Sequence, residues 1–139
     1  MQSCGVEDVE PWLVERISED PTILGLGDLD LKHASWRSRQ VSLLLQDPGE
    51  SAMYVVELQL GPTDDRHLIR LFEHWDATRK RHCRNRCLAV LVAEQIAPRY
   101  LNILQVISKA VPVALREIRV SEAAGATTPG FVPVGLLLR

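Results

Sequence analysis

The chain has 139 residues, of which 46% are hydrophobic and 24% are charged, and its formal net charge is -2. This length is that of one ordinary domain, and the composition is typical of a globular protein rather than a disordered one. The slightly negative charge argues against a protein that coats nucleic acid through bulk charge, although it leaves room for a local basic patch.

The targeting signals and the cysteines indicate the cellular location and the redox state to expect. The chain has no apolar run long enough to span a membrane, and residues 1–8 lack the basic and apolar regions of a signal peptide. We therefore expect one cytoplasmic domain over residues 1–139, with no membrane contact. The three cysteines, Cys4, Cys83 and Cys87, are an odd number without framework spacing, so we expect reduced thiols.

The first half of the chain predicts one helix and three strands. Val9, Trp12, Leu13 and Ile17 follow helical spacing, and the proline after Asp20 ends that helix near residue 19. A turn rich in glycine follows at 23–28. The predicted strands are then 31–36, 41–46 and 53–60, with a hairpin turn at 47–50 between the last two.

The second half alternates helices and strands. Leu68, Leu71, Phe72 and Trp75 predict an amphipathic helix over 65–81, with Thr63 or Asp64 as its N-cap. The unbroken apolar run at 87–93 is typical of a central parallel strand. The remaining predictions are a helix at 98–110, a strand at 111–120, a mobile loop at 121–130 and an apolar segment at 131–138.

This order predicts an α/β fold with a mixed sheet of four to five strands and helices on both faces. The core has the order α-β-β-β-α-β, and a helix and a strand follow. The apolar segment 131–138 has two interpretations: it adds an edge strand, or it packs on a partner chain and favours a homo-oligomer.

The strand at 53–60 carries the residues that suggest chemistry. Glu57 and Gln59 lie two residues apart, so their side chains share one face, opposite to Val56 and Leu58. A carboxylate in this place can bind Mg²⁺ through oxygen, usually with a second carboxylate, waters and a substrate phosphate. Such a metal activates water and offsets the charge of phosphodiester cleavage.

A wider pattern around these residues resembles the PD-(D/E)XK nuclease superfamily. The matching stretches are 39–47, Val56-Glu57-Leu58-Gln59 and Asp64-Asp65-Arg66-His67. Within the superfamily the chain is similar to a group of uncharacterised bacterial proteins. They share a stretch like Glu57-Leu58-Gln59-Leu60-Gly61-Pro62-Thr63-Asp64, then His67 and Trp75-Asp76, and something like Val92-Ala93-Glu94 and Arg99-Tyr100-Leu101-Asn102. The resemblance covers about residues 12–120, and it implies that the predicted α-β-β-β-α-β core is restriction-endonuclease-like.

The resemblance implies a site with a visibly incomplete signature. It makes Glu57 the metal ligand, with Ser42 where the superfamily has Asp and Gln59 where it commonly has Lys. A hydroxyl is a poor substitute for a carboxylate at Mg²⁺, whereas Gln can still orient a water. His67 would support the metal or a phosphate, or else belong to a solvent-facing stripe with Arg70 and His74. Glu15 on the first helix is a weaker candidate for the same cleft.

Basic residues give the candidate nucleic-acid contacts, which are Arg39, Arg70, Arg79, Lys80, Arg81 and Arg84. Cations at the end of a helix also complement its dipole, which is a sufficient structural reason for some of them. His82, Cys83 and Cys87 have a spacing that zinc permits, but Cys87 begins a buried strand and no second pair exists, so we favour a structural role.

Two functions follow as hypotheses. The first is a Mg²⁺-dependent nuclease-like domain acting on or binding DNA. The alternative is a nuclease fold that no longer cuts and serves as a nucleic-acid-binding or protein-assembly module. A third arrangement, in which a partner subunit completes the site, also fits the missing carboxylate. Convergence of Ser42, Glu57, Gln59 and His67 in one cleft would favour the first hypothesis.

Overall fold

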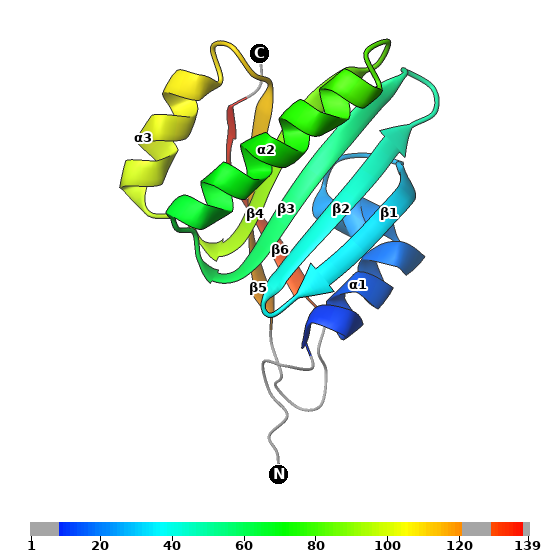
Figure 1. Ribbon diagram of the computed structural model, residues 1–139. Coiled ribbons are helices and arrows are strands. Elements are labelled where there is room, and N and C mark those ends of the chain that lie inside the picture. The colour runs from blue at the N-terminus through cyan, green and yellow to red at the C-terminus, as the bar shows by residue number, and fades with distance from the viewer. Residues whose placement is uncertain (1–8, 121–128, 138–139) are drawn as a thin grey trace.

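The computed structural model describes residues 9–120 and 129–137, which fold into helices packed on one sheet (Figure 1). The helices are α1 (Val9–Glu19), the 3-10 helix η2 (Pro21–Leu24), α2 (Asp65–Arg81) and α3 (Pro98–Ile107). The strands are β1 (Asp30–Arg37), β2 (Gln40–Asp47), β3 (Ala52–Pro62), β4 (Arg86–Gln95), β5 (Val113–Val120) and β6 (Pro129–Leu137). No helix in these two ranges is both long and apolar enough to span a bilayer.

The sheet is mixed and its strands lie in chain order, from β1 at one edge to β6 at the other. β1, β2 and β3 form an antiparallel meander, β3, β4 and β5 are parallel, and β6 returns antiparallel to β5. The predicted α/β fold and element order are confirmed.

The sheet has six strands rather than four to five, because residues 129–137 add the edge strand β6. This segment therefore pairs within the chain, and the structure gives no support for an oligomer built on it. The loop predicted at 121–130 lies outside the described residues, except for Pro129 and Gly130, which begin β6.

Helices cover both faces of the sheet, as predicted (Figure 1). The side chains of α1 and η2 pack on one face in a core that contains Leu13, Ile17, Leu24, Leu43, Leu45, Val56 and Leu58. α2 and α3 pack on the other face in a core that contains Leu68, Leu71, Leu104, Val55, Leu91 and Leu115. Successive residues of β3 alternate between the two cores. Glu57 and Gln59 consequently face α2, on the side of the sheet away from α1.

The β1–β2 hairpin leaves one polar strip uncovered. Its two turn residues, Ser38 and Arg39, have φ of 44° and 73°, the left-handed conformation that a tight two-residue hairpin requires. Residues paired across antiparallel strands share a face, so His33, Ser35 and Arg37 of β1 lie on the α2 side. α2 packs on β3 and β4 rather than over the hairpin (Figure 1). The side chains of His33, Ser35 and Arg37 are therefore exposed.

A buried arginine fastens η2 to the sheet on the opposite face. Arg116 of β5 is only 8% exposed, and burial lowers the pKa of its guanidinium. It donates to the carbonyls of Leu24 at 3.2 Å, Gly25 at 3.0 Å and Leu115 at 2.8 Å. Over 9–120 and 129–137 it has no ion pair with a carboxylate. Backbone carbonyls therefore satisfy this cation.

Candidate functional site

The site centres on a carboxylate that is only half satisfied. Glu57, in the middle of β3, is 1% exposed, and the Nδ1–H of His74 on α2 donates to its Oε2 at 2.8 Å. Its other oxygen, Oε1, is buried and has no hydrogen-bond partner among the described residues. A buried acceptor without a donor is costly, so this atom is the one most in need of a ligand.

Two more predicted residues lie beside Glu57 on the same face. Ser42 of β2 is its direct cross-strand partner, and Gln40 is the partner of Gln59. The Nε2 of Gln59 donates to the carbonyl of Pro62 at 2.8 Å, while its Oε1 has only a long contact, 3.4 Å, from Gln40. The structure thus gathers Ser42, Glu57 and Gln59 in one polar patch on the α2 side of the sheet.

His67 also lies at this patch, but it contacts the backbone rather than the carboxylate. Its Nε2 is 2.9 Å from the carbonyl oxygen of Glu57, which can only accept, so Nε2 carries the proton. Nδ1 then accepts from the hydroxyl of Thr63 at 3.3 Å. Asp64 is the N-cap of α2 and accepts from the His67 N–H at 2.9 Å. With both ring nitrogens occupied, His67 fixes the β3 backbone and has none left for a metal.

Burial gives His67 a measurable pH signature. Desolvation lowers its pKa below the usual 6.5, so the folded protein holds the neutral ring while the unfolded chain takes up a proton more readily. The unfolding free energy should therefore be highest above pH 6.5 and fall as the pH drops below it, by up to about 1.4 kcal/mol per pH unit. Denaturant unfolding across this range measures it.

The comparison with a variant isolates this histidine from other titrating groups. His67→Gln should lose that share of the pH dependence, whereas His82→Gln, at the partly exposed C-cap of α2, should keep it. Equal pH dependence in the wild type and His67→Gln would contradict the assignment.

The stripe formed by His67, Arg70 and His74 faces the sheet rather than solvent. Arg70 donates to Oε1 of Gln40, so it reaches the same patch as the two histidines. The sequence marked this stripe by its spacing, but not the bond between His74 and Glu57. That bond depends on how α2 docks on β3. Arg39, one of the predicted nucleic-acid contacts, is exposed at the hairpin tip.

The other predicted basic residues divide into separate groups. Arg79 and Lys80 form ion pairs with Asp76 at 2.7 and 2.9 Å. The hydrogen bonds from these two cations lower the pKa of the Asp76 carboxyl, and the bond from Lys80 has the larger effect. Arg79 also lies over the ring of Trp75, 4.9 Å from its centre. Both cations are thus engaged on the helix surface. Arg81 is exposed at the end of α2 and Arg84 in the turn after it.

Glu15 does not reach the site. It is exposed on α1, whose apolar side packs on the opposite face of the sheet. The prediction that Glu15 points into the same cleft as Glu57 was therefore wrong. Sequence spacing places a residue on a helix but does not show which face of the sheet that helix covers.

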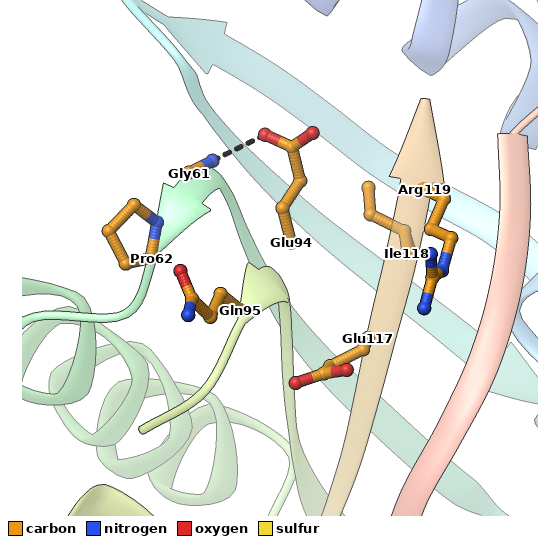
Figure 2. A pocket seen from close by; sticks show the side chains of 7 residues that line it. All are labelled: Gly61, Pro62, Glu94, Gln95, Glu117, Ile118 and Arg119. Atoms are coloured by element: carbon orange, nitrogen blue, oxygen red, sulfur yellow. Dashed lines mark hydrogen bonds between the residues drawn. The ribbon is translucent and has the colours of Figure 1, made fainter. Parts of the chain in front are cut away.

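A separate hollow lies away from this patch, at the carboxyl ends of β3, β4 and β5 (Figure 2). It holds about 890 Å³, and Glu94 and Glu117 are among its lining residues. Oε1 of Glu94 accepts from the N–H of Gly61 at 2.6 Å, and Oε2 of Glu117 accepts from the N–H of Ile96 at 3.1 Å. These carboxylates are bonded to the backbone at the ends of the strands, which gives them a structural role.

No group of three or more His, Cys, Asp or Glu side chains gathers as a metal site within the described part of the chain. Cys83 is exposed and Cys87 is buried at the start of β4, in agreement with the structural role favoured above. A cation at Glu57 would therefore need hydroxyl, amide, water or phosphate oxygens as its other ligands.

Comparison with solved structures identifies the fold as nuclease-like. EndoMS in its apo form matches with a TM-score of 0.62 and 15% identity over 84% of this chain and 48% of that one. A repair endonuclease from Pyrococcus abyssi matches with a TM-score of 0.60 and 14% identity over 84% and 49%. EndoMS in complex with dsDNA matches with a TM-score of 0.61 and 16% identity over 84% and 46%.

At such low identity the likeness shows the fold, and the chain spans about half the length of these structures. No protein-family model and no curated protein sequence matches the chain.

Proposed function

We propose that this chain is a nuclease-like domain that acts on DNA and holds Mg²⁺ through Glu57. The observation that carries the proposal is Oε1 of Glu57, a buried carboxylate oxygen that has no donor among the described residues, at the centre of a polar patch in a nuclease-like fold. The solved structures with this fold include a repair endonuclease from Pyrococcus abyssi and a complex of EndoMS with dsDNA. These two structures support DNA as the polymer on which this site acts.

The donor set fits a hard cation with an incomplete protein shell. Mg²⁺ takes oxygen ligands, often one or two carboxylates together with waters and substrate phosphates. Glu57 offers one free carboxylate oxygen, and Ser42 offers a hydroxyl from the facing position. When bound there, the ion would supply a more acidic water and a counter-charge for the phosphate.

The remaining residues have positioning roles. His74 holds Oε2 of Glu57, while His67 fixes the β3 backbone at the same residue. Gln59 is anchored through its amide N–H to Pro62, which leaves its side-chain carbonyl oxygen able to accept a hydrogen bond from a water and so to orient it. Arg39 and Arg70, near that end of the patch, are the cations best placed for a DNA phosphate.

The test is calorimetric binding of Mg²⁺ and Mn²⁺, followed by a plasmid-nicking assay. Wild type should bind and nick, whereas Glu57→Gln, which keeps the shape and the bond from His74, should lose both. Glu73→Gln removes an exposed carboxylate from α2 and should leave both unchanged. If wild type neither binds metal nor cuts, the nuclease proposal fails. The fold would then be that of a module for nucleic-acid binding or protein assembly.

A further inference from the structure

A second pocket lies beside the Glu57 patch, between the β1–β2 hairpin and the C-terminal half of α2. It holds about 310 Å³. His33 and Leu44 line it from the hairpin, and His74, Ala77, Thr78, Arg81 and His82 line it from α2 and its C-cap. This volume is near the lower end of the range of small-ligand pockets, roughly 300–1,000 Å³, so it suits one nucleotide-sized group.

The lining chemistry fits a base and a phosphate. Three imidazoles, His33, His74 and His82, give flat rings on which a base can stack, and Leu44 and Ala77 add apolar surface. Arg81 supplies a permanent cation, and no carboxylate lines the pocket. His74 also forms the wall toward Glu57, since its Nδ1 binds that carboxylate at 2.8 Å. A ligand here would thus be separated from Glu57 by a single ring.

The pocket continues into the uncovered polar strip of the hairpin. Along β1, His33 is followed on the same side by Ser35 and Arg37, about 14 Å farther at roughly 3.4 Å per residue. On α2, Arg70 and Arg81 are about 16 Å apart along the axis at roughly 1.5 Å per residue. The strip therefore has cations at both ends and hydroxyls of Ser35 and Ser42 between them.

We infer that this pocket and strip bind an unpaired nucleic-acid strand, with one base in the histidine pocket and phosphates at Arg81, Arg37 and Arg70. In a duplex the base faces are stacked on one another, so only an unpaired strand offers a face to the imidazoles. The inference rests on the proposed function for the class of ligand, and it adds which form of that ligand the site takes.

Fluorescence anisotropy with a labelled oligothymidylate and with a labelled hairpin duplex tests the inference. EDTA is present, so binding is read without cleavage. Wild type should bind the single strand at least about tenfold tighter than the duplex. His33→Ala should weaken single-strand binding about tenfold, the value of one stacking contact. The double variant with Arg37→Gln and Arg81→Gln should weaken single-strand binding further. It should also reduce the slope of log affinity against log salt concentration by about 1.4, or about 0.7 per lost phosphate contact.

Arg16→Gln removes one exposed arginine from α1, across the sheet, as the control for a single lost charge, and it should bind as wild type does. Circular dichroism checks that each variant folds. Equal affinity for duplex and single strand, or pocket variants that behave like Arg16→Gln, would overturn the inference. If wild type binds the strand but never cuts it, the nuclease proposal fails and this inference stands.

Discussion

Ser42→Asp is expected to raise the affinity for Mg²⁺ by at least about tenfold and to increase nicking. Ser42 and Glu57 are direct cross-strand partners on one face, where Cβ atoms are about 5 Å apart. A carboxylate at residue 42 would therefore give the cation a second charged ligand. Without metal the same change should lower the melting temperature, because like charges would face each other. Calorimetry and thermal unfolding, in EDTA and in Mg²⁺, measure both effects.

The control for this gain is Ser35→Asp. Ser35, on the edge strand β1, is the cross-strand partner of Ser42 on the side away from β3. Its side chain therefore lies on the same face of the sheet, one strand farther from Glu57. It should change neither metal affinity nor the melting temperature in Mg²⁺. An unchanged affinity in Ser42→Asp, or an equal gain in Ser35→Asp, would show that residue 42 does not share a cation with Glu57.

Arg116→Met is expected to lower the free energy of unfolding by about 2–4 kcal/mol. The guanidinium donates to three carbonyls, two of them at the end of η2, and methionine keeps the apolar stem but offers no donor. The carbonyls of Leu24 and Gly25 would then lose their donors from β5, and η2 would lose its anchor on the sheet. Urea unfolding of wild type and variant measures the difference.

Arg119→Met gives the comparison, because it removes an exposed arginine three residues farther along the same strand. Its effect should stay within about 0.5 kcal/mol. If both variants unfold alike, the bonds of Arg116 contribute no net stability, and its burial would have to be explained otherwise.

Most of the fold was predictable because single residues mark it clearly. Leu68, Leu71, Phe72 and Trp75 indicated the helix that the structure places at Asp65–Arg81, and the alternation in β3 correctly put Glu57 and Val56 on opposite faces. The edge strand β6 was one of two alternatives, because an apolar segment does not show whether it pairs within its own chain. η2 was read only as a turn, since four residues give no period.

The site was predictable only in part, for a different reason. Local spacing brought Ser42, Glu57 and Gln59 to one face, because strand pairing follows from a short turn. The hydrogen bond from His74 to Glu57 joins α2 to β3, and the bond from Arg116 to Leu24 joins β5 to η2. Both bonds depend on how these separate elements pack together. The sequence of the strand Val113–Val120 does not show whether Arg116 is exposed to solvent or is buried and donates to backbone carbonyls.

The strictly sequential order of the strands bears on how this chain folds. Every strand pairs with its neighbours in sequence, so no pairing waits for a distant segment to return. Proteins with such local pairing generally fold faster than those in which distant segments must meet. The meander of β1, β2 and β3, which contains Ser42 and Glu57, is joined by tight turns and ends at Pro62. During synthesis these residues emerge before α2, which supplies His74, so Glu57 would be placed in its strand before its partner exists.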